Sequence, residues 1–338
     1  MAGRRAALLA GLSGLALLHA PACARTSASA RTVTHALGQT VVEGEPRRIV
    51  TLFQGATDIV LALGARPIGA VESWTHKPVY PYLREAMQGV AMIGLETQPS
   101  LEDIVHLRPD LIIASRFRNE RIYALLGQIA PTVALQEIYT FKQNTALIGQ
   151  ALGRQPRARA LLDDWAARTA RLCAVLGQPG ALGEPQVPGE PAPQGARPGP
   201  GTATRRAPIT VSVLEFREDH VRVYLAGSFA GTVLTDAGFV WPAGQADAGI
   251  YRKLTSKEGI PLLNADVVFL LLRSDRQAVR QNYQDWSAHP LWQRLDAVRD
   301  DQVYPVDNVD WSLGGGILSA NRMLDRLDAL AGRIEGRA

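Results

Sequence analysis

Two fifteen-residue segments in different halves of the chain align with each other without a gap. Residues 100–114 read SLEDIVHLRPDLIIA, and residues 256–270 read SKEGIPLLNADVVFL. Each begins with Ser-x-Glu, which is typical of a helix start, because Ser caps the N-terminus and the helix dipole favours a nearby acid. Each ends in an apolar run typical of a buried strand. The repeat therefore predicts two equivalent halves that share this order of helix, turn and strand.

The sequence around the repeat alternates between strand-like and helix-like patterns. Short apolar runs of the length of buried strands lie at residues 48–52, 68–71, 110–114, 132–135, 209–214, 221–224, 266–272 and 303–306. Helical patterns separate several of these runs, and a last amphipathic pattern covers residues 316–332. Alternating strands and helices favour mostly parallel sheets covered by helices. We therefore expect an α/β fold.

The clearest helical pattern covers residues 156–176. Apolar side chains recur there at helical spacing, and Pro156 occupies the first turn, where proline is tolerated. A helix of this length extends over about 30 Å at a rise of ~1.5 Å per residue, which is the width of a small domain. The helix is therefore long enough to bridge two domains.

The composition changes directly after this helix. Residues 177–201 contain seven Gly and seven Pro and no aromatic residue. Such a segment cannot bury enough apolar surface to order itself, so we interpret residues 178–207 as a flexible insertion. The remaining parts are an N-terminal lobe at 31–154, a connecting helix at 155–177 and a C-terminal lobe at 208–338.

The N-terminus has the pattern of an export signal. Arg4 and Arg5 precede an apolar stretch at residues 6–18, which is followed by small residues. We expect residues 1–30 to be a cleaved signal peptide, read by the general secretion route or by the twin-arginine route. Lipidation of Cys23 is an alternative, and an apolar first helix of a cytosolic protein is another. Later apolar runs are too short to span a membrane.

Charge and motifs exclude several function classes. The formal net charge is +4, and three of the positive charges lie in the first thirty residues. The rest of the chain is almost neutral, so we expect no nucleic-acid partner. The sequence has no P-loop, no G-x-S-x-G, no H-E-x-x-H and no C-x-x-C motif, and its six His lack the spacing of metal ligands. We expect neither an enzyme nor a resident cofactor or metal.

Arginine and aromatic residues are concentrated where the predicted strands end. Ligands bind beyond the carboxyl ends of the strands in parallel α/β sheets. Arginine grips carboxylate, catecholate or hydroxamate oxygens through paired hydrogen bonds, and aromatic rings form rigid apolar walls. The candidate ligand-binding residues are Trp74, Arg116, Arg118, Arg217, Tyr224, Arg273 and Trp311. Phe53, Gln54 and Tyr139 also lie at strand ends.

A series of longer motifs makes the sequence resemble a known family. In chain order, the motifs are RRIVTL, SLEDIVHLRPDLIIA, SFAGTVLTDAG, the SKE helix with NADVVF, HPLWQRLDAV and VYPVDNVDW. Together they resemble the periplasmic substrate-binding proteins of iron–siderophore ABC (ATP-binding cassette) importers. The resemblance implies two Rossmann-like lobes with mostly parallel sheets, joined by one long helix, with a ferric siderophore bound in the cleft between them.

The resemblance also implies partners. It predicts a monomer in the periplasm that delivers its ligand to a permease and its ATPase. In this family a glutamate on each lobe docks on arginines of the permease, and the matching positions are Glu102 and Glu258, which are also identical in the internal repeat. The same fold binding haem, cobalamin or a bare metal ion is the alternative, and the sequence does not choose between catecholate, hydroxamate and citrate siderophores.

Overall fold

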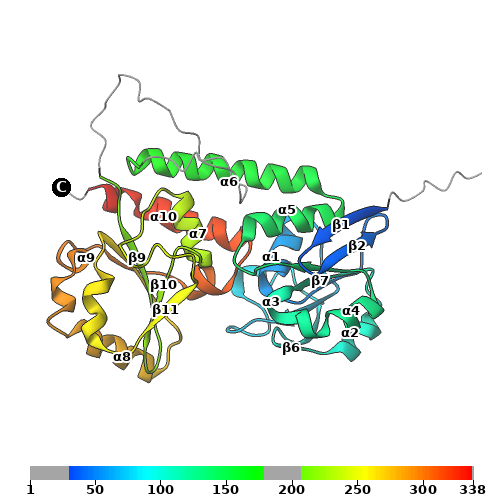
Figure 1. The fold of residues 1–338 in the computed structure, drawn as a ribbon, viewed down its shortest axis with the longest axis horizontal. Coiled ribbons are helices and arrows are strands. Elements are labelled where there is room, and N and C mark those ends of the chain that lie inside the picture. Colours follow the sequence, from blue (N-terminus) through cyan, green and yellow to red (C-terminus); the bar gives the residue numbers. More distant parts are fainter. Residues whose placement is uncertain (1–29, 179–206, 337–338) are drawn as a thin grey trace, which may run out of the picture.

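The computed structural model describes residues 30–178 and 207–336. They form two lobes that lie side by side, with a long helix running along both (Figure 1). This arrangement confirms the predicted α/β fold of two lobes and a connecting helix. Nearly all of the predicted signal peptide, with Cys23, and of the insertion at 178–207 lies outside the described residues.

The N-terminal lobe is built on a six-stranded sheet in the order β6-β5-β4-β3-β7-β8. Its strands are β3 (Ile49–Thr51), β4 (Gly69–Glu72), β5 (Ala91–Leu95), β6 (Gln98–Pro99), β7 (Leu111–Ser115) and β8 (Thr132–Leu135). All neighbours pair in parallel except β5 and β6. The helices are α1 (Gln54–Ala62), η1 (Pro81–Leu83), α2 (Leu101–Leu107), α3 (Arg116–Asn119), η2 (Glu120–Ile122), α4 (Tyr123–Ile129) and α5 (Phe141–Leu152). A separate hairpin, β1 (Arg31–His35) and β2 (Gly38–Val42), precedes them.

The C-terminal lobe has a five-stranded sheet in the order β11-β10-β9-β12-β13. Its strands are β9 (Val211–Phe216), β10 (Val221–Tyr224), β11 (Tyr251–Leu254), β12 (Val267–Leu272) and β13 (Val303–Pro305). The helices are α7 (Phe229–Asp236), η3 (Lys257–Leu263), α8 (Gln277–Ser287), η4 (Trp292–Arg294), α9 (Asp296–Arg299), the π-helix η5 (Val309–Leu313) and α10 (Ile317–Glu335). β12 pairs in parallel with β9 and with β13, whereas β10 pairs antiparallel with both β9 and β11. This half of the sheet departs from the expected parallel order because residues 217–220 form a hairpin turn that is too short for a crossover.

The helix α6 (Gln155–Val175) joins the two lobes. Near its N-terminus, Arg154 donates a hydrogen bond of 2.9 Å to the carbonyl of Leu63 in the N-terminal lobe. Further along, the indole Nε1 of Trp165 donates to Asp236 Oδ2 at 2.8 Å, at the end of α7 in the C-terminal lobe. α6 therefore bridges the lobes, as the helical pattern predicted.

The carboxylate of Asp58 forms a second connection between the lobes. Asp58 is fully buried on α1, and it accepts hydrogen bonds from the backbone N–H groups of Leu318 at 2.8 Å and Ser319 at 3.0 Å, at the start of α10. The hydroxyl of Tyr82 donates a third hydrogen bond, at 2.8 Å. An apolar core continues through this contact from the N-terminal sheet to the C-terminal sheet. The two lobes are therefore packed directly on each other at this contact.

The internal repeat appears as two capped helices, but they differ in type. The hydroxyl of Ser100 caps α2, and that of Ser256 caps η3, so both predicted helix starts are present. The second helix is a 3₁₀-helix. It contains Pro261, whose ring would clash in an α-helix with the carbonyl of the residue four positions earlier. Glu102 and Glu258 are both exposed in the first turns. In the described ranges 30–178 and 207–336, every helix is too short or too polar to cross a bilayer.

Candidate ligand-binding cleft

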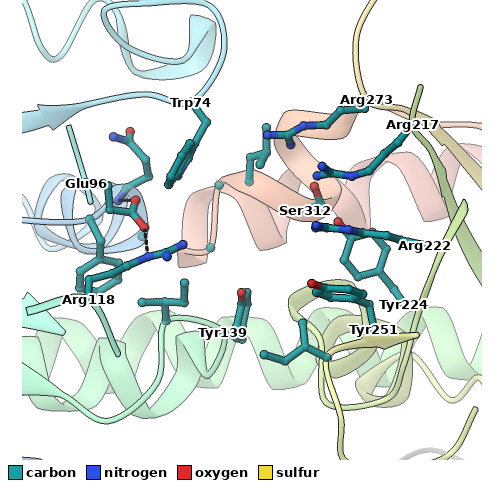
Figure 2. Close-up of a pocket in the computed structure, with 18 residues that line it drawn as sticks. Trp74, Glu96, Arg118, Tyr139, Arg217, Arg222, Tyr224, Tyr251, Arg273 and Ser312 are labelled. Carbon is teal, nitrogen blue, oxygen red and sulfur yellow. Dashed lines mark hydrogen bonds and ion pairs between the residues drawn. The ribbon is translucent and has the colours of Figure 1, made fainter. Parts of the chain in front are cut away.

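A cleft of about 310 Å³ lies between the two lobes. Figure 2 shows that its walls carry arginine and aromatic side chains from both lobes. The start of α1 and the segment from Ser312 to Gly315, just before α10, also line the cleft. Asp58 of α1 binds the start of α10, directly after this segment, so part of the cleft lining adjoins the contact between the lobes.

Arg118 is the charged centre of the N-terminal wall. Its Nε lies 3.2 Å from Oε1 of Glu96, and its guanidinium carbon lies 5.5 Å from the ring centroid of Trp74 and 4.6 Å from that of Phe117. The backbone N–H of Arg118 donates to the hydroxyl of Ser115, which caps α3 after β7. The carboxylate and the two rings therefore fix the direction of the arginine.

Glu96 lies in the turn between β5 and β6, and only 5% of its side chain is exposed. Its Oε2 accepts a weak hydrogen bond of 3.4 Å from the backbone N–H of Gln54 at the start of α1. Burial raises the pKa of Glu96, and the positive charge of Arg118 opposes that rise. The negative charge of Glu96 therefore largely offsets the positive charge of Arg118 on this wall.

Three arginines form the charged part of the C-terminal wall. Arg217 directly follows β9, Arg273 directly follows β12, and Arg222 lies in β10. The guanidinium of Arg222 stacks on Tyr251, 4.1 Å from its ring centroid. The Nε of Arg222 is buried and has no hydrogen-bond partner among the described residues.

Tyr224 and Tyr139 add hydroxyl groups to the cleft. Burial raises the pKa of Tyr224 to about 12, and burial also raises the pKa of Tyr139. Both side chains are therefore neutral near pH 7, and each can donate a hydrogen bond to a ligand oxygen. The arginines exceed the acids at the cleft, so the site is suited to an anion that also has apolar or aromatic parts.

The structure brings most of the sequence-predicted residues together. Five of the seven candidates line the cleft, namely Trp74, Arg118, Arg217, Tyr224 and Arg273. Phe53, Gln54 and Tyr139, which lie at predicted strand ends, line it as well.

Arg116 and Trp311 do not line the cleft, which corrects the expectation from the sequence. Arg116 is 46% exposed on α3 and pairs with Glu120, one helical turn away, at 3.4 Å. Trp311 is 1% exposed and packs on Phe269, with the ring centroids 4.4 Å apart. The turn of α3 directs Arg118 rather than Arg116 to the cleft, and η5 directs Ser312 there while Trp311 enters the core.

Sequence reasoning missed Glu96, Arg222, Tyr251 and Ser312. Strand alternation contained a signal for Arg222, because Val221 and Val223 face one core and therefore leave Arg222 and Tyr224 on the other face. Glu96 and Tyr251 lie next to or in strands that the sequence did not reveal. Within residues 30–178 and 207–336, no group of three His, Cys, Asp or Glu side chains is placed to hold a metal ion.

Comparison with known proteins identifies the family. The family model described as "Periplasmic binding protein" matches residues 49–186. The achromobactin-binding periplasmic protein of Dickeya dadantii is 49% identical over 292 residues, which cover 86% of this chain and 88% of that protein. This chain belongs to the periplasmic binding protein family.

Two further matches agree with this assignment. The probable siderophore-binding lipoprotein YfiY of Bacillus subtilis is 34% identical to this periplasmic binding protein over 313 residues, which are 90% of this chain and 88% of YfiY. The crystal structure of Staphylococcus aureus SirA complexed with staphyloferrin B aligns with a TM-score of 0.77 and 35% identity, over 90% of this chain and 98% of SirA. The resemblance inferred from the sequence motifs is thereby confirmed.

Proposed function

We propose that this periplasmic binding protein binds an anionic ferric siderophore in the cleft between its lobes and delivers it to an ABC importer. The observation that carries the proposal is the convergence of Arg118, Arg217, Arg222 and Arg273 on one cleft. The names of the relatives support it, since they refer to achromobactin, to a siderophore and to staphyloferrin B.

The geometry suits a ligand that brings its iron already chelated. In such a complex the siderophore supplies the oxygen ligands of the ferric ion, and the protein recognises the outer surface of the complex. The arginines offer N–H groups in fixed forks to anionic oxygens. The rings of Trp74 and Tyr251, both partly exposed at the cleft, offer apolar faces to the organic part of the ligand. Because both walls contribute, bound ligand would contact both lobes.

The proposal extends to delivery. The protein would act as an exported monomer, with the N-terminal segment directing its export, and it would pass its cargo to a permease and its ATPase. Glu102 and Glu258 are exposed, one on each lobe, and each lies in the first turn of a Ser-capped helix. Two acids set on separate lobes would let a transporter with paired arginines fix the orientation of the binding protein.

Ligand titration tests the binding function. Tryptophan fluorescence of the purified protein is measured with ferric catecholate, hydroxamate and citrate-type siderophores, with hemin and with cobalamin. We expect a saturable change with one class of ferric chelate, because Trp74 lies in the cleft. Tight binding of hemin or cobalamin without a response to any ferric chelate would refute the proposal.

Matched arginine variants test the site. Changing Arg118, Arg217 or Arg273 to Ala should each weaken binding about 30- to 150-fold, which corresponds to about 2–3 kcal/mol for one charge-assisted contact. Arg116→Ala is the matched control, because Arg116 is exposed and lies outside the cleft. Equal losses for Arg116→Ala and for the cleft variants would show that the assigned cleft is not the binding site.

A further inference from the structure

Glu215 lies behind the arginines of the C-terminal wall. Its side chain is fully buried on β9, and its Oε2 lies 2.8 Å from Nε of Arg217. Its Oε1 lies 3.6 Å from Nη1 of Arg273 and accepts no hydrogen bond from any described residue. One carboxylate, which does not itself line the cleft, therefore contacts two of the cleft arginines.

The strand register places this acid among the arginines. Glu215 is the direct cross-strand partner of Arg222 on β10 and of Leu271 on β12. Residues two apart on a strand share a face, so Glu215 lies on the same face as Arg217. Leu271, its partner on β12, lies two residues before Arg273 and shares that face in the same way. Figure 2 shows the side chains of Arg217, Arg222 and Arg273 extending in the same direction from this wall.

A carboxylate is an unexpected residue at this position of β9. Val211 and Val213 occupy the same face of the strand and are completely buried in the apolar core. An apolar side chain would continue that pattern, and a buried ion pair is seldom more stabilising than well-packed apolar residues. Stability therefore does not explain why an acid occupies this position. The arginines beside it do, because two like charges placed side by side repel each other and would turn toward solvent without an acid to hold them.

We propose that Glu215 is a positioning residue that holds Arg217 and Arg273 side by side with their remaining N–H groups directed into the cleft. It contacts no ligand itself. The inference rests on the proposed function, since the two arginines are the groups that would grip the anionic chelate. Each guanidinium uses one nitrogen on Glu215 and keeps the others for the ligand.

Position and charge can be separated by substitution. Glu215→Asp keeps the negative charge but withdraws the carboxylate by one methylene, which breaks the contact with Arg217. We expect this variant to bind the ferric siderophore about tenfold or more weakly. If Glu215 served only as a counter-charge, the affinity would stay within about twofold of the wild-type value, and the inference would be overturned.

A second set of variants tests whether Glu215→Asp weakens binding through general damage to the C-terminal lobe. In a chain with Arg217→Ala and Arg273→Ala, adding Glu215→Asp should change the residual affinity by less than about twofold, because the acid acts through those arginines. The same loss in both backgrounds would show a merely structural role. Arg116→Ala provides a neutral background, in which the full loss is expected.

A spectroscopic measurement on the unmodified protein keeps the test valid if the variant fails to fold. In ¹⁵N-labelled protein without ligand, the Nε–H signal of Arg217, assigned by its loss in Arg217→Lys, should exchange slowly with water. Exchange as fast as that of an exposed arginine such as Arg84 would refute the positioning role. If the wild-type protein binds no ferric siderophore, the proposed function fails, while the Arg217 signal still decides whether Glu215 holds the arginine.

Discussion

Asp58 makes the stability of this protein depend on pH in an unusual direction. Burial raises the pKa of its carboxyl group to about 6, although the N–H groups of Leu318 and Ser319 and the hydroxyl of Tyr82 oppose the rise. Arg322 lies over the ring of Tyr82, 5.4 Å from its centroid, but it pairs with Asp310 rather than with Asp58. Asp58 therefore has no basic partner among the described residues to stabilise its ionised form directly.

The magnitude follows from the difference between the folded and unfolded pKa values. An aspartate in the unfolded chain has a pKa near 3.8, so between about pH 4 and pH 6 the folded protein keeps a proton that the unfolded chain has released. The free energy of unfolding therefore falls as the pH rises through this window. A difference of about two pKa units corresponds to about 3 kcal/mol.

Urea unfolding of the wild type and of Asp58→Asn at several pH values from 4 to 7 measures this effect. The contributions of the other titrating groups to the free energy of unfolding cancel in the difference between the two proteins. We expect the stability of the wild type relative to the variant to fall by about 2.4 kcal/mol across this range, because part of the full difference lies below pH 4. Tyr82→Phe is the control, because removing the hydroxyl that lowers the pKa of Asp58 should move the fall to higher pH. A difference that is constant or that increases with pH would refute the reasoning.

Three further predictions concern motion, the insertion and docking. The interior of α6 from residue 157 onward contains neither Gly nor Pro, so X-ray scattering should show only slight compaction with ligand, and a large compaction would contradict this. Deleting residues 180–201 should leave siderophore affinity unchanged, because a Gly- and Pro-rich segment has little apolar surface to bury. A loss of more than about 2 kcal/mol in the free energy of unfolding would show instead that the segment packs on a lobe. Changing Glu102 and Glu258 together to Ala should preserve siderophore affinity and abolish uptake by the cognate permease, whereas normal uptake would end the docking hypothesis.

The elements that the sequence revealed are those with a strong apolar pattern. β7 and β12 are continuous buried runs, and α6 and α10 have clear helical spacing, so all four were predictable. β11 reads YRKL and is mostly exposed at a sheet edge, and the hairpin of β1 and β2 buries few side chains. Strands that pair through their backbone and bury little leave no apolar pattern, so they could not be predicted in this way.

The part of the site that lies at the carboxyl ends of strands was predictable, because ligands bind there in parallel α/β sheets. Arg118, Arg217 and Arg273 follow strands that the sequence revealed, and all three line the cleft. The choice between Arg116 and Arg118 depends on where α3 begins, and that boundary is set by the Ser115 cap rather than by an apolar pattern. Glu215 lay beyond the predicted end of its strand, and its role depends on cross-strand pairing that local patterns do not contain.

The apolar core that continues from one sheet to the other has a consequence for how the molecule folds. The internal repeat describes two halves of similar design, yet α10 begins on an acid of the opposite lobe, and α6 packs on both. Neither half can bury its share of this interface alone. Heating should therefore produce one cooperative transition in calorimetry, with equal calorimetric and van't Hoff enthalpies, so the two lobes constitute a single thermodynamic unit.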